Sequence, residues 1–318
     1  MSPTALHPRL RAALATITVD LPRLTARVGG TTVDAENPDA LRHALANAVY
    51  ERLHAGLAHE ATPRPRSLRD APYEELLADA VPHAETELSL PAARVAPAPD
   101  PGERVVTLDG VRTLVPAAHL RYDGEDRALL RYPCARPALS AGFFLVDGSA
   151  GRPSGDRIVR FYLHVTDAAA GPHVWGTLLR ALEERPIRYQ AKVSSSPRLY
   201  PRHDAIVVYL EELEEGGVPA IDLPAVVTGL PGMGRTTSVF TRELAPGLAT
   251  ASEPADPRTG MSRMSFGQHR AHALAEGLLE HARESLPGSA ETAVSRALAR
   301  AQADPAAPWR NLARDPAE

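Results

Sequence analysis

The chain has 318 residues, of which 44% are hydrophobic and 23% charged, and its formal net charge at pH 7 is −4. This is the composition of a globular protein of one large or two smaller domains, without the global positive charge of a nucleic-acid-binding protein. Its sequence contains no apolar run of the roughly 18–20 residues that a membrane span needs, and no signal-peptide pattern, and its single cysteine, Cys134, excludes an internal disulfide. We therefore expect a cytoplasmic protein with no nucleic-acid or membrane partner.

The first third of the chain carries helical patterning. The spacing of apolar residues predicts amphipathic helices over residues 5–28, 39–57 and 67–82. The proline-rich segment RVAPAPDPG, residues 94–102, is the strongest linker signal in the chain. We expect a helical N-terminal region over residues 1–95.

After residue 102 the hydrophobic period changes from helical to alternating. Alternation predicts strands within RVVTLDGVRTLVP (104–116, a hairpin around Asp109-Gly110), SAGFFLVDGS (140–149), DRIVRFYLHVTD (156–167), IRYQAKVSS (187–195) and DAIVVYLEEL (204–213). Helical spacing returns in the segments 171–185, 265–285 and 289–304. We expect an α+β domain over residues 103–318, with a central, mostly antiparallel or mixed sheet flanked by helices.

Lys192 is the only lysine in a chain with 34 arginines. A coding bias accounts for the arginine excess, and chance alone is one explanation for a single remaining lysine. The functional explanation is chemical, because arginine stays protonated whereas a buried lysine near other cations loses its proton more easily and then serves as a base. Arg188, Arg198 and Arg202 all lie within ten residues of Lys192. This setting favours a neutral amine.

Strand alternation predicts a polar sheet face. It places Arg160, Tyr162 and His164 on one side of their strand. In the strand over residues 187–195 alternation places Lys192 on one face, and in the strand over residues 204–213 it places Tyr209 on one face. If the three strands are neighbours, these side chains line one polar cleft. A solvated sheet face is the alternative, but arginine, tyrosine, histidine and a lone lysine suit anion recognition better.

The segments RFYLHV, IRYQAKV, YPRHDAIVVYL, FTRELAPGLATASEP and SFGQHRAHALAEGL resemble the HopA-type effector family, over roughly residues 155–285. LAPGL followed by SFGxHR is the most specific part. That family includes the lyase proteins of class V lanthipeptide and thioamitide biosynthesis, and it is distantly similar to the phosphothreonine lyases that bacterial pathogens inject into host cells.

The resemblance implies a reaction and its partners. Such lyases remove phosphate from phosphothreonine or phosphoserine by β-elimination, without a metal or another cofactor, and leave dehydrobutyrine or dehydroalanine. The implied substrate is a ribosomally made precursor peptide. An aminoglycoside-phosphotransferase-like kinase phosphorylates that peptide first and is a possible complex partner.

Roles for the anion-binding and basic residues follow from the resemblance. Lys192 occupies the place of the family's catalytic lysine, so we assign it as the general base that takes the Cα proton. Arg160 and Arg202 match phosphate-binding positions, and Tyr209 matches a tyrosine that positions the phosphopeptide. Arg270, near the start of a helix, is a third phosphate ligand.

The general acid is less well defined. Tyr162 stands where the injected lyases carry a histidine, which is a departure from their pattern. His164 is the second candidate, although biosynthetic relatives commonly have asparagine there. His269 and Arg263 are secondary site candidates, and Arg258 is a weaker one on the same loop.

Three further motifs have alternative explanations. GLPGMGRT, residues 229–236, has P-loop spacing but Arg235 in place of the lysine, and we expect a flexible glycine loop near the site instead. His269, His272 and Glu276 have a spacing that suits zinc, but we expect no metal there. The acidic segment EELEEGG, residues 211–217, is expected to be a solvated strand end.

Two other functions remain open at this point. The chain is alternatively a non-catalytic scaffold that binds the phosphopeptide or the kinase, or an effector with a protein target. A scaffold would have no chemical reason to keep one lysine at the base position.

Overall fold

The computed structural model describes residues 5–57, 67–108, 110–155, 157–212, 221–261, 264–284 and 289–312. The predicted α+β class is confirmed. The helices are α1 (Pro8–Leu14), α2 (Pro38–Val49), α3 (Ala71–Asp79), α4 (Gly171–Glu183), α5 (Leu223–Val227), α6 (Phe266–Glu284) and α7 (Ala290–Arg300). A π-helical turn (Tyr50–His54) extends α2.

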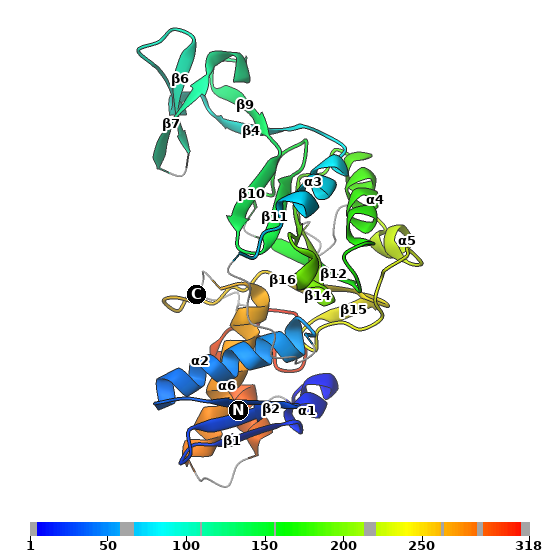
Figure 1. Ribbon diagram of the computed structural model, residues 1–318. Coiled ribbons are helices and arrows are strands. Elements are labelled where there is room, and N and C mark those ends of the chain that lie inside the picture. The colour runs from blue at the N-terminus through cyan, green and yellow to red at the C-terminus, as the bar shows by residue number, and fades with distance from the viewer. Residues whose placement is uncertain are drawn as a thin grey trace.

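The centre of the molecule is a seven-stranded sheet in which every neighbouring pair is antiparallel (Figure 1). In spatial order its strands are β10 (Ala135–Ser140), β11 (Phe143–Asp147), β13 (Tyr189–Ser194), β14 (Arg202–Glu211), β12 (Ile158–Val165), β16 (Leu248–Ser252) and β15 (Arg242–Ala245). The strands predicted around Tyr162, Lys192 and Tyr209 are therefore immediate neighbours, with β14 between the other two.

Helices cover both faces of this sheet. Phe161 and Ile206 belong to a core that includes Trp175 and Leu178 of α4. On the opposite face, Tyr162 packs with Phe266 of α6 in a core that also takes in α2 and the N-terminal strands. Because alternate strand residues point to opposite faces, β12 contributes to both cores. The face predicted to be a polar cleft is thus partly covered by the N-terminal region and α6.

The helix expected over residues 5–28 is wrong beyond Leu14. The chain instead forms an antiparallel meander of β1 (Ile17–Asp20), β2 (Thr25–Val28) and β3 (Thr31–Asp34). Threonine and valine dominate these strands, and their branched side chains favour extended backbone. Gly29, with φ of +58°, makes the turn between β2 and β3.

Residues 85–133 form two small sheets that project beyond the central one (Figure 1). One has the order β4 (Glu85–Pro91), β9 (Arg127–Pro133), β8 (Leu120–Asp123), and the other has β5 (Val95–Pro97), β6 (Glu103–Leu108), β7 (Val111–Pro116). The predicted hairpin of β6 and β7 is confirmed. The expected linker over residues 94–102 is wrong, because β5 pairs with β6. The expected helical region over residues 1–95 includes, in its described part, the four strands β1 to β4.

Candidate functional site

The register of the central sheet brings the predicted side chains onto one face. Across β13, β14 and β12, the aligned residues are Lys192, Val207 and Tyr162 in one row, and Gln190, Tyr209 and Arg160 in the next. This arrangement confirms the alternation argument for Lys192, Tyr209, Arg160 and Tyr162. A register shift between Leu163 and Val165 separates His164 from these rows.

Lys192 is half-buried and lies among aromatic rings. Its Nζ is 4.3 Å from the ring centroid of Phe143, on the adjacent strand β11, and 5.8 Å from that of Tyr209. The Cζ of Arg202 is 5.6 Å from the same Phe143 centroid. The amine and one guanidinium therefore share a single ring, which holds two cationic groups side by side.

Arg202 is held in place by Asp204 and Tyr50. Its Nε and Nη2 donate to the two carboxylate oxygens of Asp204 at 2.8 and 3.0 Å, and Nη2 also donates to the Tyr50 hydroxyl at 3.0 Å. Burial opposes ionisation of Asp204, but the adjacent guanidinium holds the pKa of this carboxyl well below its usual range. Among the described residues nothing hydrogen-bonds to Nη1, so Arg202 retains a donor for an anion.

His54, in the π-helical turn, completes the support beneath Arg202. Its Nδ1 lies 3.0 Å from the Ser238 hydroxyl, its Nε2 lies 3.8 Å from Asp204, and its ring packs edge-on against Tyr162. Burial lowers the pKa of His54 to about 4, so the ring is neutral at pH 7. Tyr50, His54 and Asp204 were not predicted from the sequence. The i, i+2 spacing that puts Arg202 and Asp204 on one face of their strand is the only local pattern that indicates their pairing.

Arg160 and Tyr162 are both buried. Arg160 forms a two-point ion pair with Glu253, and its Cζ lies 5.0 Å from the Tyr209 ring centroid. The Tyr162 hydroxyl has no hydrogen-bond partner in the described part of the chain, and burial raises the pKa of this phenol. Any phosphate at Arg160 would therefore compete with Glu253, and the Tyr162 hydroxyl is enclosed.

His164 lies beside the glycine-rich segment 229–236. Its Nδ1 donates to the Thr236 carbonyl at 3.0 Å, its ring packs against His203, and burial lowers its pKa. Backbone bonds from Gly234 to the His164 carbonyl and from Thr166 to the Gly232 carbonyl pin the segment to β12. The segment follows α5 instead of a strand, so it lacks the context of a P-loop, and its anchoring contradicts the expected flexible loop.

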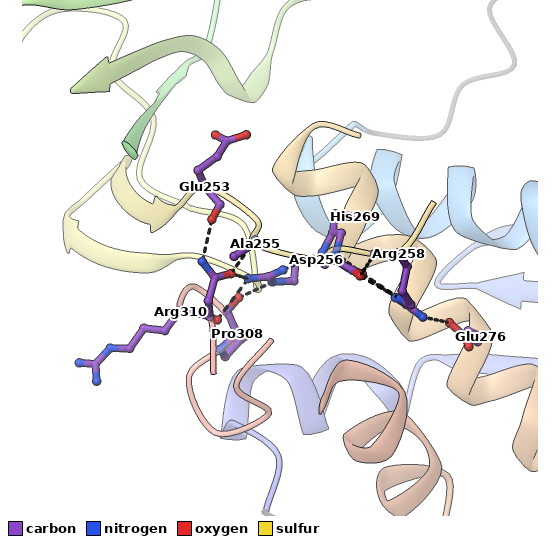
Figure 2. A network of polar contacts seen from close by, with 10 residues as sticks. Glu253, Ala255, Asp256, Arg258, His269, Glu276, Pro308 and Arg310 are labelled. Carbon is purple, nitrogen blue, oxygen red and sulfur yellow. Dashed lines mark hydrogen bonds and ion pairs between the residues drawn. The ribbon is translucent and has the colours of Figure 1, made fainter. Parts of the chain in front are cut away.

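His269 and Arg270 are completely buried. His269 lies against Asp256, as Figure 2 shows, and Arg270 binds the C-terminal segment. Arg270 donates to the Pro308 carbonyl at 2.7 Å, to the Arg310 carbonyl at 3.2 Å and to Nδ1 of His269 at 2.7 Å. Because a guanidinium only donates, His269 carries its proton on Nε2, which donates to Asp256 at 2.9 Å. Burial lowers the pKa of His269 to about 4 and that of Arg270 to about 10.

This network borders the polar sheet face at Glu253, whose carbonyl accepts from Asn311 and whose carboxylate pairs with Arg160. Figure 2 shows the side chains joining α6, the segment after β16 and the C-terminal loop. Arg258, the weaker phosphate candidate, pairs with Asp256 at 2.7 Å and with Glu276 at 3.4 Å.

Arg263 and residues 213–217 of the acidic segment lie outside the described residues. Within those residues no group of three or more metal-ligating side chains is found, and His272 packs against His43.

A cleft of about 1180 Å³ opens between the projecting β-sheets and the polar face of the central sheet. Gln190, Tyr209, Arg160 and Glu253 form its floor. Seven arginines and two glutamates line it, which is a dense positive charge in a chain whose net charge is −4. Tyr209 contacts both the cleft and the Lys192 amine, so the cleft adjoins the lysine.

The sequence matches the model of a protein family described as the HopA1 effector protein family, over residues 134–310. No curated protein matches it. Two effector proteins are among the solved structures to which the chain is similar. The effector protein from Pseudomonas syringae pv. syringae strain 61 is 18% identical, with a TM-score of 0.48, 87% of this chain covered and 93% of that chain. The effector protein from Pseudomonas syringae pv. tomato strain DC3000 is 12% identical, with a TM-score of 0.45, 85% of this chain covered and 95% of that chain.

No helix in the described ranges combines the length and the apolar character that crossing a membrane requires.

Proposed function

We propose that this chain, which belongs to the HopA1 effector protein family, is a lyase that removes phosphate by β-elimination from phosphothreonine or phosphoserine in a peptide. The observation that carries the proposal is the placement of the only lysine, Lys192, against the same Phe143 ring as Arg202. A base and an anion-binding group side by side are what this elimination needs.

In the proposed reaction the Lys192 amine takes the proton from Cα of the phosphorylated residue. The C–H electron pair becomes the second bond between Cα and Cβ, and the Cβ–O bond breaks. Its electrons leave with the phosphate, so the products are a dehydroamino acid and inorganic phosphate. The open Nη1 of Arg202 is placed to bind the phosphate as negative charge accumulates on its bridging oxygen.

The two candidate general acids, His164 and Tyr162, differ in how accessible they are to a substrate. His164 is half-buried beside Thr236, whereas the Tyr162 hydroxyl is enclosed beneath α6. The proposal therefore relies on charge neutralisation by guanidinium groups to release the phosphate, because the Nδ1 proton of His164 is already donated to the Thr236 carbonyl and burial lowers the pKa of its ring. Tyr209, on the cleft floor, would contact the peptide.

The biological setting is also proposed. The resemblance of the segments around Lys192 and Arg270 to lyases of class V lanthipeptide and thioamitide pathways supports a ribosomally made precursor peptide as the substrate. An aminoglycoside-phosphotransferase-like kinase would phosphorylate that peptide before elimination.

Mass spectrometry of a phosphothreonine peptide incubated with the protein tests this function. Elimination lowers the peptide mass by phosphoric acid, whereas a phosphatase leaves a product one water heavier. An unchanged peptide mass, with retained phosphopeptide binding, would favour the non-catalytic scaffold instead. The enclosed Tyr162 hydroxyl and the Arg160–Glu253 pair are the observations on the side of that second function.

A further inference from the structure

The outer wall of the cleft comes from residues 85–133, which precede the part of the chain that matches the family model. This wall contributes Arg94, Arg127 and Arg131, and the rest of the cleft contributes Arg136, Arg152 and Arg188 besides Arg160 on the floor. Only Glu87 and Glu253 oppose them among the lining residues, and Glu253 is committed to Arg160. Arg131 pairs with Glu87 and Arg136 with the buried Asp147, both at 3.6 Å, and the other arginines leave the outer cleft with a net positive charge.

Several of these guanidinium groups have no carboxylate partner. Arg94 is exposed, and in the described part of the chain it makes no hydrogen bond or ion pair. Arg127 and Arg188 are also exposed, and they bond only to the hydroxyl groups of Ser89 and Ser154. Hydrogen bonds from Ser154 and the nearby charge of Arg188 lower the pKa of Glu211, so the charges of Arg94 and Arg127 are the less compensated ones, and an external anion gains charge-assisted hydrogen bonds there.

The cleft also borders an open strand edge. Five consecutive residues of β4, from Glu87 to Pro91, line it, although alternate side chains of a strand point to opposite faces. β4 is an edge strand of its sheet. The segment around Gly151 lies against this edge at Glu87, where a Cβ at Gly151 would come within 2.8 Å of the Glu87 carbonyl. Outside the sheet, no backbone hydrogen bond between described residues involves Leu88, Ser89 or Leu90.

We infer that this cleft binds an acidic peptide segment in extended conformation, with its backbone paired to the edge of β4 and its carboxylates on the cleft arginines. An exposed strand edge supplies peptide hydrogen bonds, and the guanidinium groups select for acidic side chains. The inference rests on the proposed function only in that a peptide is the substrate. Because Tyr209 links the cleft to Lys192, the acidic segment would be a flank of the residue that reacts.

Fluorescence anisotropy with the full chain tests this binding without any phosphate. The probe is a labelled peptide in which glutamate alternates with valine, and its reference has glutamine in place of glutamate. We expect the glutamate peptide to bind at least about tenfold more tightly, and the variant Arg94→Glu/Arg127→Glu to abolish that preference. Equal binding of the two peptides, or a preference retained in the double variant, would overturn the inference.

Arg112→Glu is the matched control. Arg112 is an exposed arginine on β7, and it lies between Thr113 and Val111 in a strand whose cleft-lining residues are Thr113 and Val115. The substitution makes the same charge change on the same small sheets but outside the cleft, so binding should stay at the wild-type level. An equal loss in Arg112→Glu would show a general charge effect and would count against the site. Circular dichroism melts should confirm that all variants remain folded.

Two probes separate a peptide site from a general polyanion site. N-methylation of alternate residues in the glutamate peptide keeps its charge but removes backbone donors, so one of the two methylation patterns should weaken binding about tenfold. Binding insensitive to both patterns would exclude edge pairing. Single-stranded DNA that displaces the peptide at equal phosphate concentration, with the same arginine dependence, would assign the cleft to nucleic acid instead. None of these outcomes depends on elimination, which the mass-spectrometric assay measures separately.

Discussion

The arginines beneath the sheet and the arginines of the cleft share a residue type and differ in their partners. Arg202 and Arg270 are buried and hydrogen-bonded within the fold, one to a carboxylate and a phenol, the other to backbone carbonyls. Arg94 and Arg127 are exposed and have no carboxylate partner in the described ranges. The comparison shows that arginine abundance alone identifies no binding site. The groups that compensate each guanidinium decide whether it supports the fold or remains available to a ligand.

Lys192 lies between these two regions, and replacing it should have the largest effect. Lys192→Ala removes the proposed base, so we expect elimination to slow by about 10²–10⁴-fold, as is typical for loss of a general base. Lys192→Arg should be nearly as inactive, because a guanidinium stays protonated. Product formation is measured by mass spectrometry, and phosphopeptide affinity by anisotropy should change little. Wild-type elimination rates in Lys192→Ala would exclude the assignment.

Arg270→Ala tests whether the buried arginines support the fold. The substitution leaves the carbonyls of Pro308 and Arg310 and the Nδ1 of His269 without a donor, and it opens a cavity. We expect the free energy of unfolding to fall by about 3–5 kcal/mol, measured by urea denaturation. Arg112→Ala, on the exposed face of β7, should change it by less than about 0.5 kcal/mol. A similar change in the free energy of unfolding for Arg270→Ala and Arg112→Ala would show that the buried arginine supports the fold no more than the exposed one does.

The buried histidines make the region beneath the sheet sensitive to pH. His54 and His269 have pKa values lowered to about 4 in the fold, against 6.5 when unperturbed, with burial as the main cause. Between these values the unfolded chain binds more protons than the folded one, so stability is complete above about pH 6.5 and declines as the pH falls toward 4. At pH 5 each histidine should cost about 1–2 kcal/mol relative to pH 7. Urea denaturation at the two pH values should show this loss, and His54→Gln should reduce it.

Local patterns in the sequence predicted much of the sheet but little of what surrounds it. Alternation in β12, β13 and β14 placed Lys192 and Tyr209 on one face, which the register confirms. The four-residue strands of the N-terminal meander are too short for periodicity to distinguish them from a helix. The position of Arg270 near a helix start suggested an anion site, but its partners come from residues 308–311, a contact between distant segments that no local pattern encodes.

Arg202 lies in the buried region but retains one open donor. Replacing it by lysine should therefore have the smallest effect, confined to the affinity for a phosphorylated peptide. In Arg202→Lys the charge opposite Asp204 remains, while the planar fork that presents Nη1 is lost. We expect affinity for a phosphothreonine peptide to fall about tenfold, with affinity for its unphosphorylated counterpart unchanged. Arg258→Lys breaks a similar arginine–aspartate fork away from the sheet face and serves as the control. Equal losses for both peptides would place Arg202 with the purely structural arginines, because a residue that only supports the fold has no means of distinguishing phosphate from hydroxyl.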